Sequence, residues 1–170
     1  MQAKDIFKSA LVVFLLLLPL RVSAATSSPS TDYYREGVEL FKKGDYRAAE
    51  AKFLEAVRYS PCYSLGYYGL GRVYLHDAER IDDAIKNLRR SVELDANLAK
   101  GYFYLGLAEY IGNRSVDALH SFSTAYEKDR RFIESLYNIG VIYDELGNTY
   151  RAFTFYRRYV NELKGRERPF

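Results

Sequence analysis

Residues 67–71 read YYGLG, and similar pentapeptides occur at 33–37 (YYREG), 102–106 (YFYLG) and 136–140 (LYNIG). Each begins with a large apolar residue and ends with glycine, so glycine recurs every 34 or 35 residues, at 37, 71, 106 and 140. A fixed period of this length is typical of proteins built by stacking one supersecondary unit. The pentapeptides therefore predict an array of four repeats.

A second marker has the same period. Alanine recurs at positions 49, 84, 118 and 152, and a large apolar residue stands four positions after each: Phe53, Leu88, Phe122 and Tyr156. Glycine in the first half of the unit and alanine in the second let two helices cross closely. Such a helix pair cannot bury its apolar faces alone and must stack on its neighbours.

Glycine and asparagine mark the expected turns inside three of the repeats, at 43–45, 112–113 and 146–148. The second repeat has HDAER at 76–80 instead, and we expect this loop to protrude. Residues 62–168 contain no proline, which favours helices throughout. The sequence thus predicts an all-α fold.

In these features the chain resembles the tetratricopeptide repeat family, whose pattern is an aromatic residue, Leu-Gly and Tyr in one helix, then Ala, Phe and Ala in the next. The second repeat has Tyr67, Leu70, Gly71, Tyr74, Ala84 and Leu88, and the fourth has Leu136, Ile139, Gly140, Tyr143, Ala152 and Tyr156. The first repeat has Tyr33, Gly37, Ala49, Phe53, Ala56 and Pro61. The resemblance implies a right-handed α-solenoid of about four helix-turn-helix repeats, at about 30–63, 64–98, 99–132 and 133–163.

Two acidic residues depart from the family pattern. Glu36 and Glu109 stand where the family prefers apolar side chains. We expect Tyr110 to take over the packing from Glu109 through a small shift.

The first 24 residues are typical of a secretion signal. Lys4 and Lys8 precede an apolar run at 10–20, and Val22-Ser23-Ala24 offers a cleavage site before Ala25. This run is shorter than the about 17–25 residues of a membrane-spanning helix, so we expect cleavage and no stable span afterwards. The alternative is an inner-membrane anchor formed by the uncleaved signal. The expected domains are a signal at 1–24, a flexible linker at 25–31, the repeat domain at 32–163 and a basic tail at 164–170.

The charge balance argues against nucleic acid as a partner. The chain has a net charge of +3, and removal of the signal would bring it to about +1. Cys62 is the single cysteine, so no intramolecular disulfide can form, and we expect a buried or capped thiol.

The resemblance also implies a binding groove, because the first helices of successive tetratricopeptide repeats line a concave surface. By helical phase, residues one and five positions after each leading aromatic residue face this surface. The predicted partner-binding residues are Tyr34, Tyr68, Arg72, Lys100, Phe103, Leu107 and Tyr137, and Phe41 would continue the surface one turn on. In the alternative, the rings of Tyr34 and Phe103 pack within the helix layer. Some members of the family hold the terminal carboxylate of chaperones, but only Lys100 matches that residue set here.

The last helix, at about 150–163, is rich in aromatic residues. Where earlier repeats have the small residues Ala56, Ser91 and Ala125, this helix has Tyr159. The helix either caps its own end of the solenoid or contacts a partner. Phe153, Phe155 and Tyr159 are the predicted terminal interface.

No pattern of residues in the chain indicates catalysis. One cysteine and two distant histidines, His76 and His120, cannot give a zinc spacing, and no phosphate loop or nucleophile elbow occurs. We therefore expect no cofactor, no metal and no enzymatic activity.

The combined features predict an exported scaffold that binds a peptide segment of an envelope or exported protein. Its expected location is the periplasm. Two alternatives stay open: a module that binds an envelope glycan through its tyrosines, and a homo-oligomeric structural component that assembles through the terminal helix.

Overall fold

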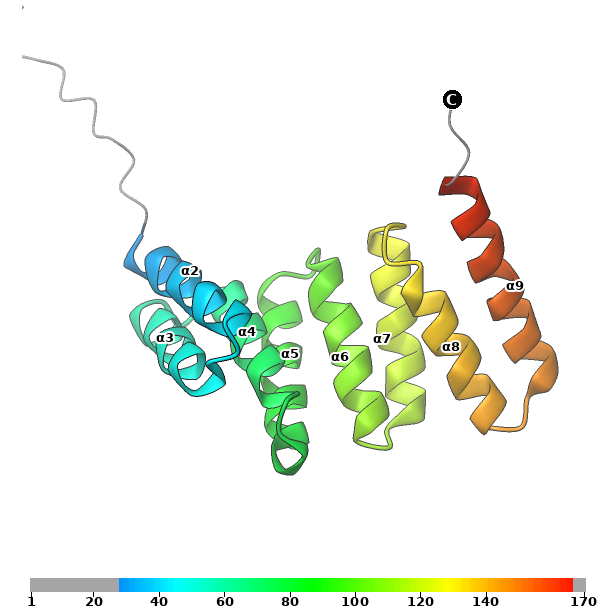
Figure 1. Cartoon of the computed structure of the whole chain (residues 1–170), viewed down its shortest axis with the longest axis horizontal. Coiled ribbons are helices and arrows are strands. Elements are labelled where there is room, and N and C mark those ends of the chain that lie inside the picture. Colours follow the sequence, from blue (N-terminus) through cyan, green and yellow to red (C-terminus); the bar gives the residue numbers. More distant parts are fainter. Residues whose placement is uncertain (1–27, 167–170) are drawn as a thin grey trace, which may run out of the picture.

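The computed structural model describes residues 28–166, which form α-helices and one short 3-10 helix but no strands. In chain order these are α2 (Pro29–Lys42), α3 (Tyr46–Tyr59), α4 (Ser64–Tyr74), η1 (Ala78–Arg80), α5 (Ile81–Leu94), α6 (Ala99–Ile111), α7 (Ser115–Lys128), α8 (Glu134–Glu145) and α9 (Thr149–Arg166). Helices α2 and α3, α4 and α5, α6 and α7, and α8 and α9 form hairpins that follow one another along the long axis of the molecule (Figure 1). The predicted all-α solenoid of helix-turn-helix repeats is confirmed.

The turns inside three hairpins adopt the conformation that their residues favour. Gly44 and Gly147 have φ angles of +80° and +73°, and Asn113 has a φ of 58°. Glycine and asparagine tolerate this left-handed region better than other residues do. In the second repeat η1 occupies the turn instead, and His76–Glu79 are exposed.

The repeated glycines lie where the two helices of each hairpin cross. A Cβ atom on Gly37, Gly71, Gly106 or Gly140 would come within 2.8 Å of Phe53, Leu88, Phe122 or Tyr156, respectively. Each partner is the large apolar residue of the second marker in the same repeat. The two markers are thus two sides of one contact, which only glycine permits.

The hairpins are joined by one continuous packing layer. A first core cluster runs from α3 to α6, a second from α6 to α8, and a third joins α7 and α8 to α9 through Tyr159 and Leu163. Polar contacts also cross between repeats, as where the Arg80 guanidinium donates to both oxygens of Glu50 at 3.0 and 3.1 Å.

Glu109 is buried, contrary to the expected shift toward Tyr110. It is 2% exposed, and its carboxylate accepts hydrogen bonds from Ser121 Oγ at 2.6 Å and Arg89 Nη2 at 3.1 Å. Tyr110 instead donates its hydroxyl hydrogen bond to Glu145. A buried carboxylate is tolerated when it is paired and hydrogen-bonded, so no shift of the helix is needed.

Both outer ends of the repeat domain extend further than expected. Helix α2 begins at Pro29, inside the expected linker, because proline suits the first position of a helix. Helix α9 continues to Arg166, inside the expected basic tail, where Arg166 Nη2 donates to the Arg130 carbonyl at 2.7 Å. The expected signal at 1–24 and the last four residues lie outside the described part of the chain. Within 28–166 no helix is long and apolar enough to cross a membrane.

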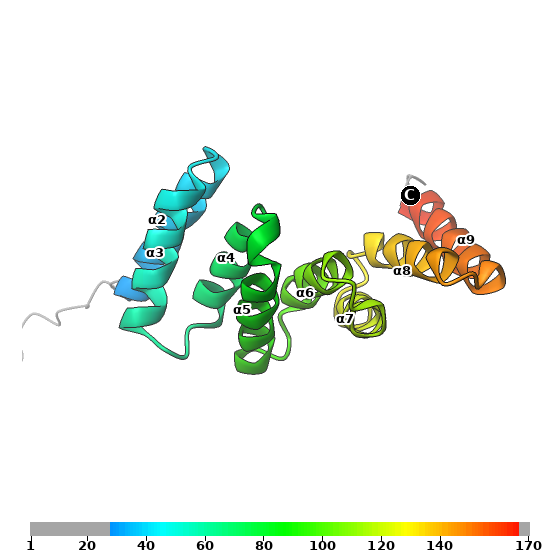
Figure 2. The ribbon, with the colours of Figure 1, turned by 90° about the horizontal axis from the view of Figure 1, so that it is seen from below.

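The row of hairpins is curved (Figure 2). Helix α2 contacts α4, and α4 contacts α6, across the intervening second helices. The first helices therefore form the inner layer of the solenoid, and their free faces form one surface, here called the inner surface.

Candidate functional site: a cationic and aromatic inner surface

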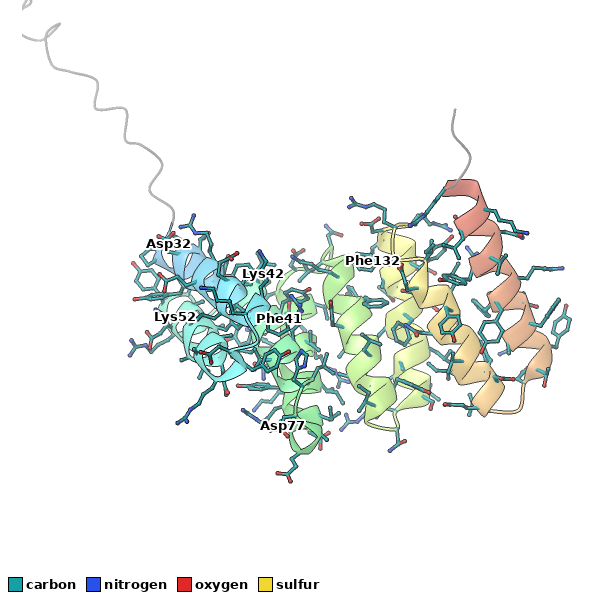
Figure 3. All side chains as sticks on the ribbon, viewed as in Figure 1. Asp32, Phe41, Lys42, Lys52, Asp77 and Phe132 are labelled. Carbon is teal, nitrogen blue, oxygen red and sulfur yellow. The ribbon has the colours of Figure 1, made fainter. Side chains whose placement is uncertain are left out.

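Arg72 of α4 lies at the centre of the inner surface. Its guanidinium carbon is 4.2 Å from the ring centroid of Phe41 on α2, 5.0 Å from that of Tyr104 on α6 and 5.5 Å from that of Tyr68. These distances are within the range of cation–π attraction. Phe41 projects from the end of α2 beside the α4–α5 hairpin (Figure 3). Three successive repeats thus surround one cation.

Within the described residues the charge of Arg72 has no carboxylate partner. Among residues 28–166 the structure contains no ion pair to Arg72, and its Nε is buried without a hydrogen-bond partner. Buried polar atoms in folded proteins are nearly always hydrogen-bonded. Arg72 is therefore well packed between aromatic rings, but its Nε lacks a hydrogen-bond partner among these residues.

Lys100 of α6 is a second cation next to the first. Its Nζ lies 4.8 Å from the centroid of the Tyr68 ring, and it has no ion pair within the described residues. Burial, reinforced by repulsion from Arg72, lowers the pKa of Lys100 below its usual 10.5. Arg72 and Lys100 are both within 5.5 Å of the Tyr68 ring centroid, so the two like charges are neighbours on the inner surface.

Tyr68 is buried beneath Arg72 and Lys100 and does not line an open groove. It is 5% exposed, and burial raises the pKa of its hydroxyl, against the opposing charge of Arg72. Burial also raises the pKa of Tyr34, which is half-buried against Phe53 and Tyr63. The prediction that the Tyr68 ring faces an open groove is therefore corrected, because its face is covered by Lys100 and its edge by Tyr104.

Two further predicted groove residues of α6, Phe103 and Leu107, border this site, since the Phe103 ring lies 5.6 Å from that of Tyr104. Phe103 packs its ring 5.8 Å from Phe122 and 5.5 Å from Phe132, which lies at the junction of α7 and α8 (Figure 3). Leu107 adjoins the same second core cluster. Phe103 thus follows the alternative in which the ring packs within the helix layer.

Tyr137 is the exposed member of the predicted set. It is 48% exposed and packs one ring face toward Tyr156 and Tyr159 of α9, at 5.6 Å in each case. The structure therefore brings Tyr34, Tyr68, Arg72 and Lys100 together in one site. Tyr137 lies near the C-terminal end of the solenoid, against α9.

Sequence reasoning missed Tyr104 as a site residue. It directly follows Phe103 and so fell outside the helical phase assigned to the groove. Its position after two other aromatic residues, in the only pentapeptide with three rings, was a usable signal.

The predicted terminal interface divides into packed and exposed residues. The Phe155 ring stacks on Tyr143, and Tyr159 packs against the third core cluster. Of the three predicted residues, Phe153 remains on the surface, at 62% exposed, and Tyr150 and Val160 of the same helix are also exposed, at 83% and 42%. Helix α9 therefore covers the end of the core with part of its aromatic face.

Cys62 and the histidines form no site with other residues. The thiol of Cys62 is exposed rather than buried, because it lies in the turn between α3 and α4. The His76 ring stacks on Tyr46 at 4.1 Å. In the described part of the chain no group of histidine, cysteine and carboxylate residues could hold a metal ion.

Two models of the tetratricopeptide repeat family match the chain, at residues 34–99 and 133–161. Together they cover more than half of the sequence, with the helix pairs of the first two repeats and most of the fourth. The chain therefore belongs to the tetratricopeptide repeat family.

Two curated relatives resemble parts of the chain. The small glutamine-rich tetratricopeptide repeat-containing protein 2 of Saccharomyces cerevisiae is 27% identical over 100 residues, which are 58% of this chain and 28% of that protein. Protein bimA of Emericella nidulans is 30% identical over 79 residues, which are 46% of this chain and 10% of that protein. The chain thus spans only a minor part of either relative.

Solved structures of the same fold cover more of the chain. MamA from Desulfovibrio magneticus RS-1 superposes with a TM-score of 0.74 over 82% of this chain and 78% of that one, at 19% identity. YrrB, described as a tetratricopeptide repeat protein with an unusual peptide-binding site, has a TM-score of 0.69 and 26% identity over 93% of this chain and 78% of its own. The first such domain of Spaghetti (RPAP3), solved with an HSP90 peptide, has a TM-score of 0.67 and 17% identity over 71% of this chain and 95% of its own.

Proposed function

We propose that this protein is a non-enzymatic scaffold that binds an extended peptide segment of another protein on its inner surface. The observation that carries this proposal is the site around Arg72, to which α2, α4 and α6 each contribute side chains. A surface assembled from successive repeats is elongated, and it can contact successive residues of a strand-like ligand. Rigid aromatic and arginine side chains are those that most often dominate binding energy.

The comparison with YrrB supports the same proposal. That protein is 26% identical to this chain over 93% of this chain, and a peptide-binding site is named for it. Repeat solenoids in general offer extended concave surfaces of this kind.

A photocrosslinking experiment tests the proposal directly. A benzophenone amino acid would replace Leu107, a partly exposed residue of α6, or, as a control, Lys86 on α5, which is exposed on the second helix of its hairpin. We expect adducts with a protein partner from position 107 and few from position 86. Equal crosslinking from both positions, or none from position 107, would contradict an inner-surface scaffold.

We also propose that the protein is exported to the periplasm and that its partner is an envelope or exported protein. The support is the pattern of charges, apolar run and small residues in the first 24 positions. Expression in a Gram-negative host followed by N-terminal sequencing should give Ala25 as the first residue. An intact N-terminus in the membrane fraction would instead support the uncleaved anchor.

A homo-oligomer is the second candidate, because Tyr150 and Phe153 remain exposed on α9. Sedimentation velocity of the chain and of its Phe153→Glu variant would decide between the two. Self-association that disappears in the variant would support assembly through α9, and a monomer in both would leave the inner surface as the proposed contact.

A further inference from the structure

Within the part of the chain that the structure describes, the two cations of the inner surface, Arg72 and Lys100, lack the acidic partners that other cations of the protein have. Arg72 and Lys100 have no ion pair among residues 28–166, although many other cations of the chain do. The two carboxylates that line a pocket together with Lys100 already have partners: Asp95 accepts from the Asn97 backbone N–H at 3.0 Å, and Asp129 pairs with Arg131 at 2.8 Å.

The placement of the two cations has an energetic consequence. Two like charges that are partly withdrawn from water raise each other's free energy, and an opposite charge nearby removes that penalty. The guanidinium is held by rings of three repeats, so it cannot swing away toward solvent without losing these contacts. The guanidinium and the Lys100 ammonium are therefore charges held in place before any ligand arrives.

We propose that Arg72 and Lys100 together bind one carboxylate, supplied by an aspartate or glutamate side chain within the peptide that occupies the inner surface. This inference rests on the proposed function and names the chemistry of its partner. Charge-assisted hydrogen bonds to a carboxylate would satisfy both cations at once.

The surroundings favour a side-chain carboxylate over a chain terminus. Aromatic residues lie on both sides of the cation pair, with Phe41 and Tyr34 from the first repeat on one side and Tyr104 from the third on the other. A peptide that continues in both directions can use both flanks, whereas a terminal carboxylate ends the ligand at the pair. The expected motif is an acidic residue with apolar neighbours on each side.

Peptide selection against the full chain tests this inference. The probe is a library of random twelve-residue peptides fused through their C-termini to a phage coat protein, so that only side chains can supply a carboxylate. We expect the enriched peptides to share one aspartate or glutamate position. Synthetic amidated copies, with the acidic residue kept or replaced by its amide, would then be titrated by calorimetry.

The variants Lys100→Gln and Arg72→Gln remove the charges one at a time. Lys52→Gln is the matched control, because Lys52 also lies over a tyrosine ring, that of Tyr33 at 5.7 Å, but is on the second helix of its repeat and pairs with Glu36. We expect either inner-surface variant to weaken the acidic peptide about ten- to a hundredfold and the control to leave it unchanged. The amide form of the peptide should bind the wild type and Lys100→Gln alike. If Arg72→Gln does not fold, Lys100→Gln carries the comparison.

The outcomes separate the inference from the proposed function. If enriched peptides crosslink to position 107 but show no acidic position, or lose nothing with Lys100→Gln, the carboxylate site is wrong and the scaffold stands. If no peptide is enriched, or none competes with crosslinking at position 107, both fail.

Discussion

Single residues decide how this chain departs from a regular repeat, and Lys100 is the clearest case. Burial and the neighbouring Arg72 charge lower its pKa, whereas a hydrogen bond from Lys52 to Glu36 raises the pKa of Lys52. A carbon–proton NMR titration of the lysine side chains should therefore find Lys100 below, and Lys52 above, the usual 10.5.

The Arg72→Gln variant extends this test. Removing the like charge should move the titration of Lys100 upward while that of Lys52 stays in place. A Lys100 midpoint that does not respond would show that Arg72 is not close enough to act on it.

Glu109 is the second residue of this kind. Replacement by alanine would leave Ser121 without its acceptor and Arg89 without its partner inside the packing. We expect a loss of about 1–3 kcal/mol in the free energy of unfolding, measured by urea denaturation. Glu109→Gln keeps an acceptor oxygen for Ser121 and should lose less; an equal loss would mean that the charge, not the hydrogen bond, matters.

The elements of this structure depend on how closely helices cross. At Gly106 a new Cβ would meet the fully buried Phe122 ring within 2.8 Å, while nothing lies within 4 Å of such an atom at Gly165. Gly106→Ala should therefore destabilise the protein by about 1–3 kcal/mol. Gly165→Ala, in the same kind of helix, should be neutral or stabilise by about 0.5–1 kcal/mol. Thermal melts of both variants compare the two sites.

Helix α9 gives a matching pair of positions. Tyr159 packs on the third core cluster, whereas Phe153 points outward and is 62% exposed. Tyr159→Ala should cost about 1–3 kcal/mol of unfolding free energy, and Phe153→Ala less than about 0.5 kcal/mol. The reverse order in denaturant melts would show that the outer face of α9 is covered in the free protein.

Much of the fold could be predicted from the sequence because the same residue pattern occurs in each of the four repeats. The glycine and alanine markers located each crossing, and Gly44, Asn113 and Gly147 located three turns. The site was harder to predict, since helical phase says which side a residue faces but not how neighbouring rings fill the space. Tyr68 is thus covered by Lys100 and Tyr104, and Tyr104 became part of the site through a contact between repeats.

The whole molecule is a curved row of four hairpins whose inner helices bring cations and rings from different repeats together (Figure 2). Both the stability of the fold and the inner surface arise from contacts between neighbouring repeats. A ligand that contacts several repeats would therefore also stabilise the contacts between those repeats. The central claim is therefore that a peptide binds across the first helices of neighbouring repeats.

An NMR titration of the full chain with a library-selected peptide tests that claim most directly. We expect backbone amide shifts to change along α2, α4 and α6, with the largest effects near Phe41, Arg72 and Lys100. Shifts confined to the exposed face of α9 around Tyr150 and Phe153, or spread over the outer helices α3, α5 and α7, would contradict it.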